Sequence, residues 1–243
     1  MLAFDVLTIF PSMFRSYFEA GLLKRALEKG IFSLRVHDLR DFTTDRHRVT
    51  DDYPFGGGQG MVMKVEPIVR GIRALKREDS QVVLLTPQGL LFNQEMALDL
   101  AKRSHLILIC GRYEGVDERV AEHFVDLELS IGNYILTGGE LPAMVIMDAV
   151  TRVLPGTVGE VSSIQEESLS RGLLKYPQYT RPAQFEGLKV PEILLSGDHE
   201  KIARWRRRES IRRTYLKRPE LLAGAKLTPE ELAILEEIRN GRA

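Results

Sequence analysis

Short apolar runs alternate with helix-like segments through the first two thirds of the chain. The runs are rich in β-branched residues and cover residues 4–9, 31–36, 82–85, 106–110 and 125–129. Between them, a period near 3.6 over residues 14–27, the apolar residues of 96–100 and a long apolar segment at 141–154 predict helices. Strands that alternate with helices in this way predict an α/β fold with a mostly parallel sheet.

Two of these helices carry further information. Gly30 follows the first, at the position where a glycine often ends a helix. The segment 141–154 is apolar on nearly all sides, so we expect this helix to be buried in the core or against another subunit.

The pattern changes after Pro155. Residues 156–170 are rich in Gly, Ser and Glu with little apolar periodicity, which is typical of a linker. Near the C-terminus, Thr228, Pro229 and Glu231 form the N-terminal signature of a capped helix. Its apolar residues, expected to face inward, are Leu232, Ile234, Leu235 and Ile238.

Composition narrows the class of protein. The 243 residues are 44% hydrophobic and 28% charged with a formal net charge of zero, as in soluble globular proteins. The longest segment without Asp, Glu, Lys or Arg has 15 residues, short of the roughly 20 that span a bilayer. We therefore expect no membrane helix, and the absence of a cleavable leader pattern predicts a cytoplasmic protein. One cysteine, Cys110, and scattered histidines predict no structural metal site.

The zero net charge hides a strongly basic segment. Residues 200–219 hold nine Lys and Arg against two Glu, a net charge of +7, so the rest of the chain carries −7. On a helical wheel Arg206, Arg213 and Lys217 share one face, joined by Arg207 and Arg218. Apolar residues share the opposite half: Ile202, Trp205, Ile211, Tyr215 and Leu216. A solvated charged face is one interpretation, but phosphate binding to a nucleic acid is favoured because acidic partners are few.

Three successive apolar runs end in loops that contain glycine, at residues 85–89, 110–115 and 130–140. Ligands of parallel sheets bind beyond the carboxyl ends of the strands, and glycine lets the backbone approach a flat ligand closely. Each loop alone is better explained as a tight turn. For the three loops together, one shared binding site and three separate turns are about equally favoured. The fingerprints of dinucleotide folds and P-loop enzymes are absent.

A second glycine cluster occupies residues 56–60, after Arg46, His47 and Arg48. A flexible hairpin explains it, and so does a backbone left bare for a nucleic acid. Gly57, in its centre, is a candidate contact for RNA.

Long strings at these positions closely resemble the bacterial tRNA (guanine-N1)-methyltransferase family. They are CGRYEG (110–115), SIGNYILTGGE (130–140), YPFGGGQGMVMKVEP (53–67), LLKYPQYTRP (173–182) and WRRRESIRRTYLKRPELL (205–222). The likeness begins at FDVLTIFPSMF (4–14) and covers nearly the whole chain. Strings of this length in one order are very specific.

The resemblance implies a parallel-sheet SPOUT methyltransferase domain with a deep trefoil knot and a small helical C-terminal domain. It places the S-adenosylmethionine-binding domain at residues 1–158, a mobile linker at 159–173 and a basic tRNA-binding domain at 174–243. It also implies a homodimer that methylates N1 of guanine 37 of tRNA, with no role for DNA or a membrane. Magnesium is a further expectation from the resemblance.

The resemblance also assigns residues. For the cofactor these are Thr86, Pro87, Gly111, Tyr113, Glu114, Ile131, Gly132, Asn133, Tyr134, Ile135, Leu136, Gly138 and Gly139. Arg152 matches a catalytic arginine, and the position of the family's general base, an aspartate, is Glu167 here. Glu166 is the competing candidate, and a solvated linker carboxylate explains either residue. Asn133, Lys175 and Gln178 also depart from the family's usual residues.

Three hypotheses remain at this point. The first is the tRNA methyltransferase just described, and the second is a SPOUT methyltransferase that acts on another RNA. The third is a non-catalytic RNA-binding protein that uses the basic helix and keeps only the fold.

Overall fold

The structure is a computed structural model that describes residues 1–158, 169 and 172–241. The chain forms two compact units, Met1–Gly159 and Glu160–Ala243, and each has a hydrophobic core of its own. Most of the expected linker, 159–173, lies outside the described residues, so its bounds stay a prediction.

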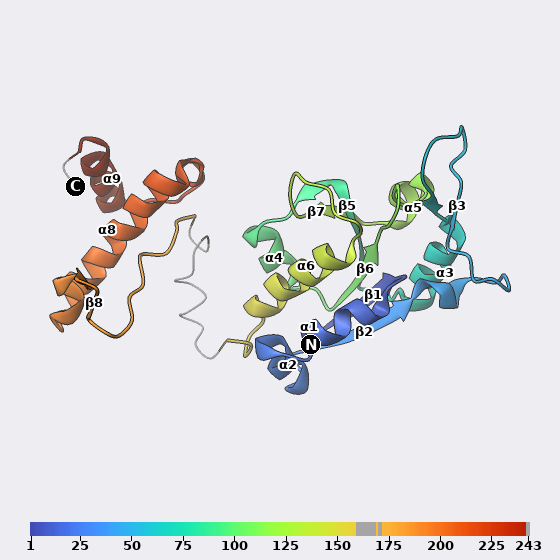
Figure 1. The fold of residues 1–243 in the computed structure, drawn as a ribbon, viewed down its shortest axis with the longest axis horizontal. Helices are drawn as coiled ribbons and strands as arrows, with labels where there is room; N and C mark the ends of the chain where they lie inside the picture. Colours follow the sequence, from blue (N-terminus) through green and yellow to red (C-terminus); the bar gives the residue numbers. More distant parts are fainter. Residues whose placement is uncertain (159–168, 170–171, 242–243) are drawn as a thin grey trace. The chain divides into compact units, whose positions relative to one another are not determined.

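A five-stranded parallel sheet forms the centre of the first unit (Figure 1). Its strands lie in the order β2-β1-β6-β5-β7, and neighbours run parallel throughout. Their bounds are β1 (Leu2–Thr8), β2 (Phe32–Asp38), β5 (Ser80–Leu91), β6 (His105–Cys110) and β7 (Leu127–Ser130). The predicted apolar runs and the α/β fold are confirmed, whereas the trefoil knot stays a prediction.

Helices cover both faces of this sheet, because successive side chains of a buried strand point to opposite faces. One face packs against α1 (Arg15–Phe18), α2 (Gly21–Glu28), α4 (Gln94–Leu100) and α6 (Glu140–Val153). The other packs against α3 (Val65–Leu75), α5 (Glu118–Phe124) and the 3₁₀ turn η2 (Leu39–Phe42). β3 (Asp51–Asp52) and β4 (Val62–Met63) form a short antiparallel hairpin that is separate from the five-stranded sheet.

The predicted continuous helix over residues 14–27 is wrong. The chain forms a 3₁₀ turn, η1 (Pro11–Phe14), then α1 and α2, with a break where Ala20 is extended and Gly21 has φ +62°. Both helices bury their apolar residues on one core, so the periodicity continues across the break. The helix end at Gly30 is confirmed, since its φ is +66° and its N–H donates to the Leu27 carbonyl.

The predicted loop at residues 85–89 is also wrong, because β5 continues to Leu91. The register against β7 shifts between Leu85 and Leu90, which marks a bulge inside the strand. A Cβ on Gly89 would overlap the backbone of Glu128 and Leu129, so this position requires glycine. Pro87 and Gly89 therefore mark an irregularity in a strand rather than its end.

Asp5 is buried in the middle of the sheet with an unusual set of donors. Arg35 donates to both carboxylate oxygens at 3.0 and 2.7 Å, and the Nε2 atoms of His37 and His105 lie 2.6 and 2.7 Å from them. The other ring nitrogen of His105 lies 2.6 Å from the Ser80 hydroxyl. Burial raises the pKa of Asp5, but the hydrogen bonds from Arg35 and the histidines outweigh it and hold the pKa below its ordinary value.

The second unit is built around α8 (His199–Lys217) and α9 (Pro229–Arg239). It also contains a hairpin of β8 (Gln184–Phe185) and β9 (Leu188–Lys189) and the 3₁₀ turns η3 (Glu192–Leu195) and η4 (Pro219–Ala223). Its buried core is small: Leu173, Ile211, Leu235 and Ile238. The predicted capping box of α9 is confirmed, since Thr228 and Glu231 bond each other's backbone N–H groups.

Leu232 was expected to face inward, and this expectation is wrong, because the residue is 50% exposed. Leu216, on the apolar half of the α8 wheel, is 60% exposed. Among the described residues, the buried hydrophobic core of this unit is limited to four side chains, and neither leucine belongs to it.

Candidate functional site

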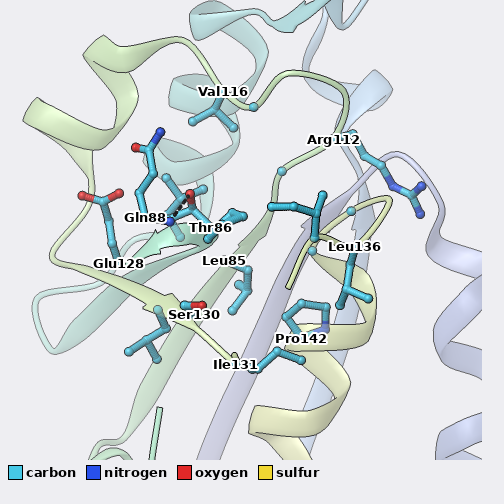
Figure 2. A pocket seen from close by; sticks show the side chains of 18 of the residues that line it. Leu85, Thr86, Gln88, Arg112, Val116, Glu128, Ser130, Ile131, Leu136 and Pro142 are labelled. Atoms are coloured by element: carbon cyan, nitrogen blue, oxygen red, sulfur yellow. Dashed lines mark hydrogen bonds between the residues drawn. The ribbon is translucent and has the colours of Figure 1, made fainter. Parts of the chain in front are cut away.

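A cavity of about 420 Å³ lies at the bulge of β5 and beyond the carboxyl ends of β6 and β7. The β5 bulge, the turn after β6 and the long loop after β7 enclose it (Figure 2). This is the edge at which parallel sheets bind their ligands. The three glycine-containing segments predicted from the sequence therefore meet at one site.

Twelve of the thirteen residues assigned to the cofactor by resemblance line this cavity. They are Thr86, Pro87, Gly111, Tyr113, Glu114, Ile131, Gly132, Tyr134, Ile135, Leu136, Gly138 and Gly139. Asn133 is the exception, since it is not among the lining residues.

Several residues of the wall were not assigned by the resemblance, although Leu85 and Gln88 lie in the glycine-containing segment 85–89. Leu85 and Pro142 add to its apolar part, and Gln88 and Glu128 add polar groups on another side (Figure 2). Glu128 carried a signal, because a charged residue inside the apolar run of β7 is unusual in a buried strand.

Close backbone contacts hold two of the loops together. The Gly139 N–H donates to the Gly111 carbonyl at 2.9 Å. A Cβ on Gly139 would lie 2.7 Å from Cα of Cys110 and 3.1 Å from Cβ of Leu85. A side chain at Gly139 would therefore push the loops apart.

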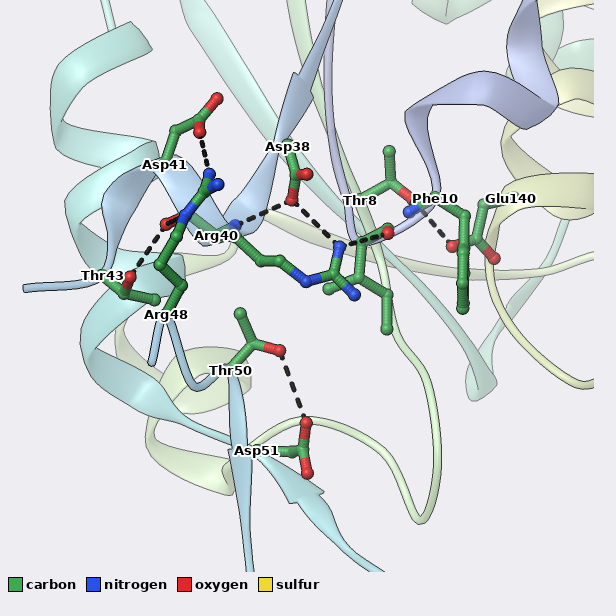
Figure 3. Close-up of polar contacts among 11 residues, drawn as sticks. Thr8, Phe10, Asp38, Arg40, Asp41, Thr43, Arg48, Thr50, Asp51 and Glu140 are labelled. Carbon is green, nitrogen blue, oxygen red and sulfur yellow. Dashed lines mark hydrogen bonds and ion pairs between the residues drawn. The ribbon is translucent and has the colours of Figure 1, made fainter. Parts of the chain in front are cut away.

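A buried ion pair fixes the same side of the cavity. Glu140, at the start of α6, is fully buried, and Arg112 donates to its Oε2 from Nε at 2.9 Å. Nη2 of Arg112 lies 2.9 Å from the same oxygen and completes the ion pair. Thr8 of β1 donates to Oε1 at 2.7 Å (Figure 3). Arg112 also donates to the Thr137 carbonyl at 3.1 Å and lies over the ring of Phe10. One carboxylate thus joins β1, the turn after β6 and the start of α6.

The β3–β4 hairpin is bonded to the cavity wall. The N–H of Glu114 donates to the Met61 carbonyl at 3.0 Å, and the N–H of Met63 donates to the Gly115 carbonyl at 2.9 Å. Gly57 lies exposed between β3 and β4 with φ +79°, in a segment that also exposes Phe55.

The two catalytic candidates are not brought together among the described residues. Arg152 lies half-buried in the last turn of α6 and does not line the cavity. Glu167 and its competitor Glu166 lie outside the described residues.

The five cations proposed for tRNA differ in their partners. Arg206, Arg213 and Lys217 form no ion pair with any carboxylate that the structure describes. Arg207 is bonded to the buried Glu231 at 2.8 Å, and Arg218 pairs with Glu220. The first three are therefore the stronger candidates for phosphate.

Within the described part of the chain, no helix is long and apolar enough to cross a membrane. No group of three or more His, Cys, Asp or Glu that could hold a metal ion occurs there either.

The sequence matches a known protein family. A family model described as tRNA (Guanine-1)-methyltransferase TrmD matches residues 2–224. A protein of Dictyoglomus turgidum named tRNA (guanine-N(1)-)-methyltransferase is 59% identical over 239 residues, which cover 98% of this chain and 97% of that protein. Proteins of the same name from Geotalea uraniireducens and Moorella thermoacetica are each 54% identical over 238 residues, covering 97% and 96% of this chain and 96% and 95% of theirs. The chain therefore belongs to the tRNA (guanine-1)-methyltransferase family.

Proposed function

We propose that this protein transfers a methyl group from S-adenosylmethionine to N1 of guanine 37 of tRNA, next to the anticodon. The observation that carries the proposal is the cavity at the carboxyl edge of the sheet, enclosed by three glycine-containing segments in a chain of this family. The names of the relatives favour tRNA over another RNA. The reaction would take place in the cytoplasm, where tRNA is found.

The residues of the cavity fit the cofactor. Its volume of about 420 Å³ is within the range of small-molecule sites. Leu85, Ile131 and Leu136 offer apolar surface for an adenine ring. Glu114 and Glu128 offer carboxylates for the positively charged parts of the molecule. When bound, the cofactor supplies a methyl group on a positively charged sulfur.

The chemistry at guanine requires a base. N1 carries a proton, so a carboxylate must accept it as the new N1–methyl bond forms and the sulfur–methyl bond breaks. We assign this role to Glu167, whose ordinary pKa near 4.3 makes it a weak base unless apolar surroundings raise that value. Arg152 would stabilise negative charge that develops on O6.

Among the described residues, no group of three or more His, Cys, Asp or Glu could hold a metal ion. A magnesium requirement stays a prediction.

Glu167→Gln tests the assignment of the base. The amide keeps the size of the side chain but has no basic lone pair, so single-turnover methyl transfer should fall by about a hundredfold or more while cofactor and tRNA affinities stay close to normal. Glu166→Gln is the matched control and should be mild. Wild-type speed in Glu167→Gln would contradict the assignment.

The outer side of α6 supports a homodimer. Leu141 and Val145 are 50% and 46% exposed on this mainly apolar helix. Exposed apolar surface of this kind is typical of an interface between subunits. Sedimentation should show a dimer at micromolar concentration, and a 27.6 kDa species would contradict it.

Labelled S-adenosylmethionine tests the function itself. The protein should transfer label to tRNA and not to ribosomal RNA, and calorimetry should show cofactor binding without RNA. Transfer to ribosomal RNA alone would favour the second hypothesis. RNA binding without any heat from the cofactor would favour a non-catalytic protein.

A further inference from the structure

The second unit contains a cavity that the proposed reaction does not use. It has a volume of about 410 Å³ and lies between the segment 176–183, the turn η3 and the N-terminal half of α8. Four of the residues that line it bear on its function: Tyr176, Tyr179, Arg181 and Arg206.

The charged residues that line this cavity are all positive. Two arginines, Arg181 and Arg206, line it, and its wall contains no Asp or Glu. Neither arginine forms an ion pair with a carboxylate in the described part of the chain, in contrast to Arg207 and Arg208 on the same helix, which bond Glu231 and Glu237. Its cations are therefore available to an anion from outside.

Aromatic rings lie beside these cations. The guanidinium of Arg206 lies 4.9 Å from the ring centre of Tyr176, which holds the arginine at the wall. Tyr179 is 50% exposed and has no aromatic partner among the described residues. Its ring offers a flat apolar face to a ligand.

We propose that this cavity binds one unstacked nucleotide of the RNA substrate, with its base against Tyr179 and its phosphate against Arg181 and Arg206. Unpaired bases of RNA loops stack on aromatic and guanidinium planes, and phosphates pair with arginine. An acidic peptide would pair with the arginines but leave the Tyr179 ring without a stacking partner, so RNA is favoured. The inference rests on the proposed function, because it takes tRNA as the ligand.

Three variants of the full-length protein test it, with tRNA affinity measured over a series of salt concentrations. Tyr179→Ala should weaken tRNA binding about fivefold to a hundredfold, since one base stack contributes about 1–3 kcal/mol. Its salt dependence should match the wild type because no charge is lost. Tyr179→Phe keeps the ring and should bind as the wild type does. Arg206→Gln should lower the slope of log affinity against log salt by about 0.7–0.9.

Two controls remove similar groups outside the cavity. Phe185→Ala removes an exposed aromatic ring of β8, and Arg212→Gln removes a cation of α8 that is paired with Glu209. Phe185→Ala should bind tRNA more tightly than Tyr179→Ala, and Arg212→Gln more tightly than Arg206→Gln. Circular dichroism and cofactor calorimetry should show that every variant is folded and binds cofactor normally.

The outcomes distinguish a failure of this inference from a failure of the proposed function. A wild-type protein that methylates tRNA while Tyr179→Ala keeps full affinity would overturn this inference and leave the proposed function standing. Equal losses of tRNA affinity in Tyr179→Ala and Phe185→Ala would also overturn it. So would a Tyr179→Ala variant that changes its oligomeric state but keeps its tRNA affinity. A wild-type protein that neither binds nor methylates tRNA would overturn both.

Discussion

Replacing Glu140 with alanine should destabilise the first unit more than any surface substitution. Glu140 is fully buried, and its carboxylate accepts hydrogen bonds from Thr8 at 2.7 Å and Arg112 at 2.9 Å. Alanine removes both acceptors and leaves the guanidinium of Arg112, whose side chain is only 15% exposed, without its counter-charge. Loss of one partner of a buried pair costs about 3–5 kcal/mol.

The size of this effect can be compared with two other variants. Glu140→Gln keeps one acceptor and the side-chain volume, so it should cost about 1–3 kcal/mol. Glu28→Gln is the control, since its pair with Lys24 is 3.7 Å long and mostly exposed. Such a pair contributes at most about 1 kcal/mol.

Urea and thermal unfolding measure the difference. Each kcal/mol shifts the melting temperature of a unit of this size by about 2–4 °C, so Glu140→Ala should melt about 6–20 °C below the wild type. A shift as small as that of Glu28→Gln would refute the claim that the pair joins β1, the turn after β6 and α6. Cofactor calorimetry should show weaker binding for Glu140→Ala, because Arg112 lines the cavity.

Three further predictions concern other parts of the chain. Asp5→Asn should destabilise the protein at neutral pH. The difference in the free energy of unfolding from the wild type should shrink as the pH falls below about 4, because a depressed carboxyl pKa gives stability that is lost on protonation. Urea unfolding at several pH values checks this. Cys110 should react with a thiol reagent only in urea, because burial, followed by the charge of Glu140, raises the pKa of its thiol well above the ordinary value. Changing Arg206, Arg213 and Lys217 together to glutamine should flatten the salt dependence of tRNA binding by about two units and leave cofactor affinity unchanged.

The sheet could be predicted because buried parallel strands appear as continuous apolar runs, and all five runs are strands. The β5 bulge could not, since Pro87 and Gly89 resemble a turn and only the neighbouring β7 shows that the strand continues. The break at Gly21 was hidden because the residues before and after it pack on one core.

The site was predictable to a similar degree. Glycine-containing segments after successive strands indicated the cavity, and the resemblance supplied its individual residues. The contacts of Glu140 were not predictable, because Arg112 and Thr8 lie 28 and 132 positions from it in the sequence and meet it only after folding. The partner of Arg207 likewise required the structure, since a helical wheel shows which residues share a face and not which residues of another helix lie opposite them.

The central claim is methyl transfer to N1 of guanine 37. Its most direct test is labelled transfer from S-adenosylmethionine to tRNA transcripts that carry G, A or C at position 37, followed by nucleoside analysis of the product. We predict label only in the transcript with G37, recovered as N1-methylguanosine. Equal labelling of the A37 or C37 transcripts, recovery of the methyl group on a ribose, or no transfer to the G37 transcript would contradict the account.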